Sequence, residues 1–583
     1  MPTLQTQRVR AHDDFEEKPS VIRAENVIPS EVPNPGSDHY HEDGPPRLHS
    51  KTFVAVAAAG LIYFVQLMNL VGVGAQGNII AEHFGHPSQS TWLTQPITIL
   101  TVVLGPIVSQ AADYWGRKWF LVILTLIGAV ASIVISRADS FAMLVAGFTI
   151  MGFAYGAQPL LHVVASEVLP RRWRGYGQAA DMVSNSFGSV VGLLVGGALN
   201  RASNPTSNGF RYYWYMVMAC FAAAALLTCL GYNPPKSKTQ HQFTHKEKLR
   251  KLDWLGYFLL SSSLVLFSIG LSWSRNPYPW SDAHVSATFS IGVVLAAALV
   301  AYETFFKDDG MFHHGLFTGN RNFSIALFCV FCEGLAFFSA NTYFAFQVNI
   351  LYETDALLVG LRYSIVLITC MASSVLAGIY SAVSRRVRWV TFTAFIIFVA
   401  FFVGMATTSL GSNNVVWGYP VLLGVALGMT LTNLVSVAQL SIPPDLISVA
   451  SGLIISIRSL GGTIALAIDN ALFSEAMGDT GKNIAAAVLP KGLSPDYLGE
   501  FITALSNHND TGLESIPGLT GEVIKLGTEA LLQTYVVAFR HVWITAACFV
   551  TLAAIGTVFL SDPREEFNMH IDAPMEAEQF ESA

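Results

Sequence analysis

Ionisable side chains that stand inside long apolar stretches of the sequence include Glu333, Arg458, Asp469 and Asp181. A charge in apolar surroundings costs on the order of a few kcal/mol unless it is paired, so such residues are the first candidates for binding or proton transfer. Glu333 has no basic residue near it in the sequence, and desolvation therefore favours its protonated form. Glu333 is the leading candidate for a proton or substrate site. The alternative is a structural carboxyl group that is hydrogen-bonded between helices.

The remaining buried polar positions are secondary candidates. Arg458 requires a carboxylate or carbonyl partner, or an anionic substrate. Asp469 stands three helical turns beyond Arg458, so the two share a helix face only roughly and cannot touch. Asp181 is either a second site or a member of a charge cluster near the end of its apolar stretch. Gln66 and Asn69 recur at helical spacing and are candidates for lining a cavity.

A charged turn separates the second and third apolar stretches and reads Ser109-Gln-Ala-Ala-Asp113-Tyr-Trp-Gly116-Arg117-Lys118. Asp113 stands at a helix end, Gly116 permits a tight turn, and two cations follow. These groups can form a charge cluster that holds two helical bundles together in one state and releases them in another. A plain basic loop explains Arg117 and Lys118 but not Asp113 and Gly116 at this spacing.

Glu167 ends the fourth apolar stretch and is followed by Pro170, Arg171, Arg172 and Arg174. We expect it to pair with Arg117 or Arg171 in the same cluster. The alternative is a solvated loop charge.

A run of glycines follows in the fifth stretch: Gly188, Gly192, Gly196 and Gly197. Positions four residues apart lie on one face of a helix, and glycines there let a neighbouring helix come close. The run is similar to the glycine signature of drug:proton exchangers, except that Leu193 stands where that signature has proline. A general packing face of small residues is the alternative.

The composition sets the elements that must position these residues. The chain has 583 residues, of which 52% are hydrophobic and 13% charged, against about 25% charged in ordinary soluble domains. Apolar blocks of roughly twenty residues predict fourteen membrane-spanning helices, the last at 540–560. The fold class is therefore an all-α polytopic membrane protein, and the net charge of -7 gives no basic field for nucleic acid.

Lysine and arginine cluster in alternate loops, which predicts that both ends of the chain are cytoplasmic. Residues 1–50 lack an apolar signal core and are expected to form a disordered tail, with a second cytoplasmic tail at 562–583. An extracellular loop is expected at 474–539. It contains Asn509-Asp510-Thr511, a glycosylation acceptor.

These motifs together resemble the fourteen-span fungal branch of the major facilitator superfamily, and within it the group of trichothecene efflux pumps and siderophore–iron transporters. The resemblance implies a six-helix bundle at 52–232, a basic linker at 233–252, two inserted helices at 253–303, and a second six-helix bundle at 321–561. It also implies alternating access around a midplane site.

The same resemblance implies a proton-coupled transporter of the plasma membrane, with a vacuolar or vesicular membrane as the alternative. Its partners would be protons, the lipid bilayer and a bulky small molecule. The glycine run favours export of a fungal secondary metabolite, toxin or drug. Uptake of a siderophore–iron chelate with protons is the second hypothesis.

The third hypothesis is a membrane enzyme or sensor with a catalytic 474–539 loop. That loop has no evident catalytic constellation, and the chain has no P-loop, no G-x-S-x-G and no H-E-x-x-H motif. We therefore expect neither an enzyme nor a bound cofactor or metal.

Overall fold

The computed structural model describes residues 48–574 with gaps at 49, 202–208, 236–239, 241–242, 274–277, 308–309, 311–313, 319, 354, 507–512, 514–515 and 518. The tail predicted at 1–50 falls almost wholly outside these residues, and so does Asn509. Within the described part, fourteen helices are long and apolar enough to cross a membrane. The predicted number of spans is confirmed.

The first half of the molecule contains six of these spans. Its helices are α1 (Ser50–His83), α2 (Gln95–Trp115), α3 (Arg117–Ser136), α4 (Phe141–Ala154), α5 (Gln158–Glu167), α6 (Arg174–Arg201) and α7 (Gly209–Gly231). A short 3-10 turn, Tyr155–Ala157, joins α4 to α5, so that these two helices form one span.

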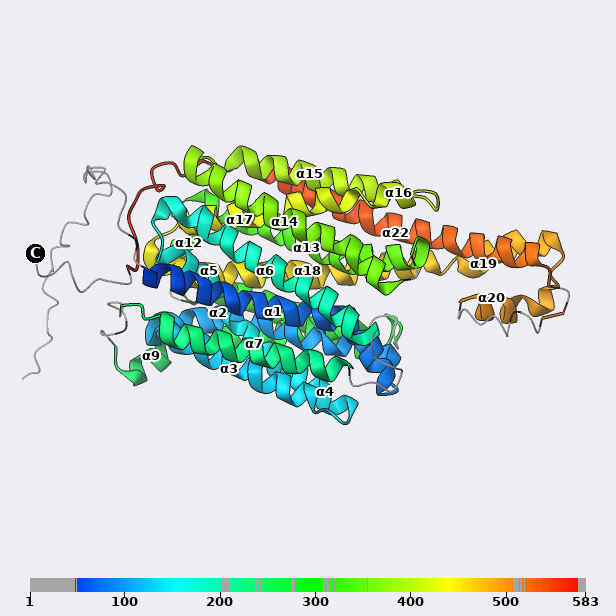
Figure 1. Cartoon of the computed structure of the whole chain (residues 1–583), viewed down its shortest axis with the longest axis horizontal. Coiled ribbons are helices and arrows are strands. Elements are labelled where there is room, and N and C mark those ends of the chain that lie inside the picture. The colour runs from blue at the N-terminus through cyan, green and yellow to red at the C-terminus, as the bar shows by residue number, and fades with distance from the viewer. Residues whose placement is uncertain are drawn as a thin grey trace, which may run out of the picture. The chain divides into compact units, whose positions relative to one another are not determined.

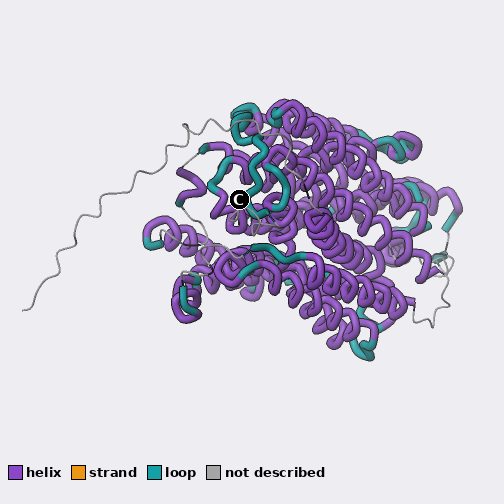
Figure 2. Tube along the Cα trace, turned by 60° about the vertical axis from the view of Figure 1, so that its left-hand side comes forward, coloured by secondary structure: helices purple, strands orange, loops and turns teal. Residues whose placement is uncertain are grey.

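The second half contains another six spans. Its helices are α12 (Gly315–Thr318), α13 (Arg321–Leu351), α14 (Ala356–Ser384), α15 (Arg388–Ala406), α16 (Asn413–Val416), α17 (Tyr419–Leu440), α18 (Ile447–Met477), α19 (Thr480–Val488), α20 (Leu498–Ser506) and α22 (Gly521–Thr557). Figures 1 and 2 show the long helices running side by side, with the loops gathered at their two ends.

We call the end where α2 stops and α3 starts the basic end, because it carries Arg117, Arg171 and Arg174. The two halves meet through α2 against α18 and through α6 against α14. Small residues make the contact close. A Cβ at Gly452 would lie 3.0 Å from the carbonyl oxygen of Gly105, and one at Gly378 would lie 2.6 Å from that of Gly175. The halves are thus in backbone contact at the basic end.

The two remaining spans, α10 (Trp254–Trp273) and α11 (Ala283–Phe305), form a pair that follows the first half. The pair packs on α2 through a small cluster that includes Val102, Tyr257 and Leu264. Before it lies the short basic helix α9 (His245–Lys251), which begins with a capping box of Thr244 and Glu247. The backbone N–H and hydroxyl of Thr244 donate to the Glu247 carboxylate and lower its pKa.

The far end, opposite the basic end, differs from a simple loop. Helix α18 continues to Met477, and α22 begins at Gly521 rather than near 540. Between them, α19 and α20 pack on the extended helices around a core that includes Ile484, Val488 and Phe501. We call this part the far-end subdomain (Figure 1, right). Its helices are amphipathic, so the hydropathy of the segment alone suggested a loop.

Candidate functional site

A cavity of about 70 Å³ lies between the two halves, about midway along the helices. The first half lines it with side chains of α1, α2, α5 and α6, and the second half with side chains of α13, α14, α17 and α18. Most of its wall is apolar, with Met182, Phe337, Phe338 and several leucines. An apolar and aromatic wall with a few polar groups is the lining that small organic ligands use.

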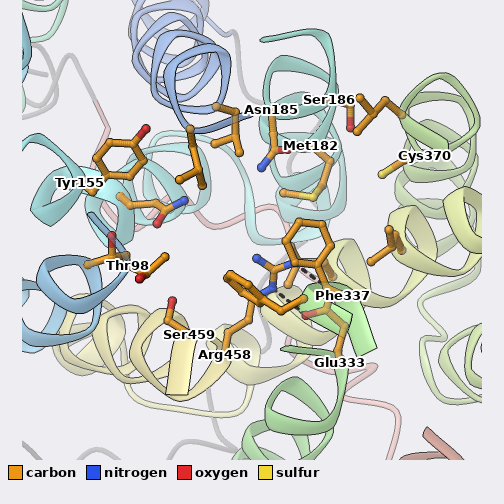
Figure 3. A pocket seen from close by; sticks show the side chains of 18 of the residues that line it. Thr98, Tyr155, Met182, Asn185, Ser186, Glu333, Phe337, Cys370, Arg458 and Ser459 are labelled. Carbon is orange, nitrogen blue, oxygen red and sulfur yellow. Dashed lines mark hydrogen bonds and ion pairs between the residues drawn. The ribbon is translucent and has the colours of Figure 1, made fainter. Parts of the chain in front are cut away.

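Glu333 and Arg458 form an ion pair in the wall of this cavity (Figure 3). Arg458 Nε lies 2.6 Å from Oε2 of the carboxylate, and Arg458 Nη2 lies 3.0 Å from Oε1. The guanidinium also stacks over the ring of Phe337, 4.5 Å from its centroid. A Cβ at Gly334 would overlap the backbone of Arg458, so this glycine lets α13 and α18 approach.

This pair supplies the basic neighbour that Glu333 lacks nearby in the sequence, the lack on which its expected protonated form was based. The neighbour is Arg458, 125 positions away in sequence, which donates two charge-assisted hydrogen bonds to the carboxylate. It also identifies the carboxylate partner that Arg458 was expected to need.

Asp469 lies on α18 beyond Arg458 and makes a different contact. Its carboxylate accepts a hydrogen bond of 2.5 Å from the hydroxyl of Ser339 on α13. Asp469 is buried but does not line the cavity. It therefore reads as a packing contact between α13 and α18.

Gln66 and Asn69 share a face of α1, as their spacing predicted, but that face does not line the cavity. Gln66 donates to the carbonyl of Ala154 at 2.9 Å, and Asn69 donates to the Tyr155 hydroxyl at 3.0 Å and accepts from Trp214 at 3.1 Å. Their expected place in the cavity is wrong, because spacing gives a helix face but not the neighbour of that face. Both side chains instead position the turn that carries Tyr155.

Tyr155 lines the cavity and was not singled out from the sequence. It sits in the 3-10 turn between α4 and α5, followed by Gly156 and then by Gln158 and Pro159. A glycine and a proline inside an apolar span were the available signal for a break in the helix there. Gln158 also lines the cavity.

Asp181 lies on α6 and is fully buried. Its carboxylate is 3.5 Å from Nδ1 of His162 on α5, and the same Nδ1 lies 2.7 Å from Oε1 of Gln178. Asp181 does not join the charge cluster at the basic end. The structure places Asp181 against a buried histidine. The residue one turn further along α6, Asn185, lines the cavity.

The charged turn at the basic end forms a cluster within the first half. Gly116 has φ of +93°, which a glycine adopts without strain. Arg117 lies 3.2 Å from Asp113 and also pairs with Glu167, while Lys118 contacts Asn233. Glu167 was expected to pair with Arg117 or Arg171, and in the structure it pairs with Arg117.

Arg171 and Arg174 pair instead with the segment that follows α22, which we call the tail segment (561–574). Arg171 lies 2.7 Å from Glu566 and 2.9 Å from Asp572, and Arg174 also pairs with Asp572. The sequence offered a signal that was not used: an acidic segment and a basic loop predicted on the same side of the membrane. The tail segment therefore joins the last helix of the second half to the first half.

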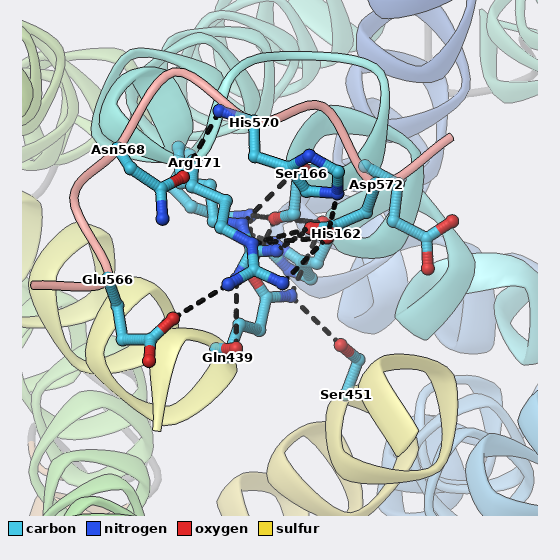
Figure 4. Close-up of polar contacts among 12 residues, drawn as sticks. His162, Ser166, Arg171, Gln439, Ser451, Glu566, Asn568, His570 and Asp572 are labelled. Carbon is cyan, nitrogen blue, oxygen red and sulfur yellow. Dashed lines mark hydrogen bonds and ion pairs between the residues drawn. The ribbon is translucent and has the colours of Figure 1, made fainter. Parts of the chain in front are cut away.

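Behind these arginines, buried polar groups connect the two halves (Figure 4). Arg174 donates to the carbonyl of Gln439 on α17 at 2.8 Å. The Ser166 hydroxyl contacts the Gln439 amide oxygen, and the Gln439 amide nitrogen donates to Ser451 at 2.9 Å. Together with the glycine contacts, this network closes the basic end beneath the cavity.

Comparison with known proteins identifies the family. The family model of the Major Facilitator Superfamily matches residues 56–466, which is more than half of the chain. This chain belongs to the major facilitator superfamily. The predicted family is confirmed, and this transporter has the membrane-spanning helical fold that the family implies.

Several relatives of this transporter are fungal efflux proteins. The MFS-type efflux transporter pyiT of Pyricularia grisea is 24% identical over 395 residues, covering 66% of this chain and 63% of that protein. The match thus spans less than two thirds of pyiT. The trichothecene efflux pump TRI12 of Fusarium sporotrichioides is 21% identical over 489 residues, covering 81% of this chain and 78% of that protein.

Among solved structures, the proton:xylose symporter XylE bound to 6-bromo-6-deoxy-D-glucose matches with a TM-score of 0.51 at 13% identity. The match covers 88% of this chain and 96% of that chain. At this identity the likeness shows the fold alone.

The glycine run of this transporter packs α6 against α1. A Cβ at Gly192 would lie 2.6 Å from the carbonyl oxygen of Met68, and Cβ atoms at Gly188 and Gly196 would overlap Phe64 and Gln76. Gly197 faces away from α1, and a Cβ there would meet only Leu357 of α14, at 3.9 Å. Three of the four glycines therefore serve one close helix contact inside the first half.

Proposed function

We propose that this transporter exports a bulky, largely apolar metabolite or drug in exchange for protons, by alternating access. The observation that carries the proposal is the cavity between the halves, whose apolar and aromatic wall surrounds one buried ion pair. The names of the relatives and the glycine run support export over uptake.

The proposed cycle uses the contacts at the basic end. In this structure that end is closed by the backbone contact of α2 with α18 and of α6 with α14, and by the Gln439 network. Access from the basic side requires these contacts to separate while each half moves largely as a rigid body. The proton gradient would supply the free energy for the cycle.

The basic end would face the cytoplasm, since lysine and arginine gather there. We propose the plasma membrane as the location, because a toxin exported there leaves the cell. A vacuolar or vesicular membrane would instead sequester it. Fluorescence microscopy of the tagged full chain distinguishes the two.

The ion pair also bears on the choice between export and siderophore uptake. Arg458 is the cation of the cavity, and Glu333 neutralises it. A ferric siderophore that carries negative charge would have to displace the carboxylate from Arg458. A neutral amphipathic metabolite can instead use the apolar wall and the hydroxyl group of Ser459.

The test is the direction of transport. The full chain is expressed in yeast that lacks its own drug pumps and siderophore transporters, and accumulation of a labelled toxin panel that includes a trichothecene is followed beside uptake of iron-55 siderophores. We expect lower toxin accumulation than in cells with empty vector, and a rise when the proton gradient is collapsed. Gradient-dependent uptake of iron-55 would show a siderophore symporter instead.

A further inference from the structure

Asp181, Glu333 and Asp469 are all buried, but the carboxylate of Asp181 differs from the other two in its hydrogen bonding. Its residue is 0% exposed, and neither carboxylate oxygen has a hydrogen-bond partner among the residues that the structure describes. By contrast, the Glu333 carboxylate accepts a hydrogen bond from Arg458, and the Asp469 carboxylate accepts one from Ser339. A buried ionised carboxylate without partners is strongly unfavourable, so a group in this position changes its charge with its surroundings.

His162 is the group that stands nearest. Its Nδ1 lies 3.5 Å from Asp181 Oδ2 and 2.7 Å from Gln178 Oε1, and within the described part of the chain its Nε2 has no hydrogen-bond partner. The orientation of the Gln178 amide follows from its other bonds, since its nitrogen donates to the His162 carbonyl at 3.0 Å. Oε1 is therefore an acceptor, and Nδ1 must carry a hydrogen.

We propose that Asp181 and His162 together form the proton-binding centre of the transport cycle. The inference rests on the proposed proton coupling and names the residues that perform it. The transported proton binds to a carboxylate oxygen of Asp181 and converts the carboxylate into a neutral carboxylic acid. Release of the same proton restores the carboxylate, so the charge of the centre changes by one per cycle.

The groups around the centre leave His162 as its immediate partner. From α1, Tyr63 packs edge-on against His162, with ring centroids 5.4 Å apart. From α18, Arg458 acts electrostatically on both Tyr63 and His162, but it is already paired with Glu333. From α14, Cys370 lines the neighbouring cavity.

Gln178 connects the centre to the contact between the halves. Its nitrogen also donates to the Ser166 hydroxyl at 2.8 Å and lies 3.5 Å from the amide oxygen of Gln439 on α17. An ionised Asp181 competes with Gln178 for the hydrogen on His162 Nδ1, whereas a protonated Asp181 leaves that hydrogen with Gln178. The protonation state of Asp181 thereby reaches the polar network that closes the basic end.

The first experiment needs no transported substrate. The full chain is reconstituted in lipid vesicles, and the carbonyl stretching band of protonated carboxyl groups is followed by infrared spectroscopy as the pH rises. We expect a component of this band in the wild type that is lost in Asp181→Asn and kept in the matched control Asp469→Asn. A titration of Asp181→Asn that is identical to the wild type would overturn the proposal.

A second variant keeps the test decisive if Asp181→Asn does not yield a monodisperse protein. His162→Gln leaves the carboxylate in place but removes the imidazole Nδ1–H that faces the ionised form. We expect the Asp181 component to remain and its titration midpoint to be displaced. An unchanged midpoint would show that His162 plays no part in the centre.

The flux measurement separates this inference from the proposed function. With the toxin that the wild type exports in yeast, Asp181→Asn vesicles should lose accumulation driven by a pH gradient but keep exchange of labelled for unlabelled toxin. A merely structural residue would lose both. If the wild type shows no gradient-driven flux, the proposed function fails; if Asp181→Asn retains that flux, only the assignment of the proton centre fails.

Discussion

At the scale of single residues, the cavity wall depends on one ion pair. Glu333 is 0% exposed and the Arg458 side chain 14%, so neither charge is well solvated. The pair is close to neutral as a unit, and it leaves the rest of the wall apolar. Removing one partner strands the other charge in the cavity wall, which is more costly than removing both.

A double-mutant cycle tests this coupling. Glu333→Ala and Arg458→Ala should each lower the free energy of unfolding by about 3–5 kcal/mol. The double variant should lose clearly less than the sum, because no uncompensated charge remains. Thermal unfolding of the purified variants in detergent gives the comparison, and additive losses would show that the two residues do not interact.

The sequence identified the important charges but not their partners. Glu333 and Arg458 stand out because they interrupt apolar stretches, yet their pairing depends on how α13 and α18 pack. Asp181 was visible for the same reason, whereas its partner His162 resembles an ordinary core histidine. The sequence around a residue predicts its helix face and the free-energy cost of burying its charge. The contacts between helices that are distant in the sequence depend on how the helices pack, and a single sequence does not show that packing.

At the scale of elements, helices approach one another most closely at glycine residues. Gly192 meets the backbone of α1, Gly334 meets the backbone of Arg458 on α18, and Gly105 and Gly452 meet each other across the halves. Such contacts let helices associate without a large apolar driving force between them. The glycine spacing in α6 predicted a packing face, and the structure shows that its partner is α1.

Two alanine substitutions in the same run should therefore differ. Gly192→Ala places a methyl group 2.6 Å from a backbone oxygen, so a helix must shift, at a cost of about 1–3 kcal/mol. Gly197→Ala meets only Leu357 at 3.9 Å and should be tolerated. Melting temperatures of the two purified variants provide the measurement, and equal values would argue against the close contact.

At the scale of the whole molecule, the tail segment ties the last helix to the first half. Backbone hydrogen bonds run from Arg171 to the carbonyl of His570 (2.9 Å) and from Arg172 to that of Asn568 (2.8 Å), beside the ion pairs of Asp572. The fourteen spans and the family could be predicted from composition and motifs. For this contact the sequence indicated only complementary charge on one side of the membrane, because the acidic tail carries no periodic pattern that would place its residues against the arginines.

Removing the tail segment should expose the loop beneath it. In a chain that ends after Glu565, Arg171 and Arg172 lose their partners from Glu566 to Asp572, and trypsin should cleave at these arginines faster than in the full chain. A chain that ends after Pro574 keeps these contacts and is the matched control. Equal cleavage rates in purified protein would show that the tail does not cover the loop.

The far-end subdomain is carried by helices that are longer than a membrane span requires. At about 1.5 Å per residue, the 37 residues of α22 are longer than a hydrocarbon core of about 30 Å requires. Because α18 and α22 continue into the subdomain without a break, the subdomain should move with the second half when that half tilts. A fluorophore on its surface would report each turnover optically, from outside the lipid and without touching the transport pathway.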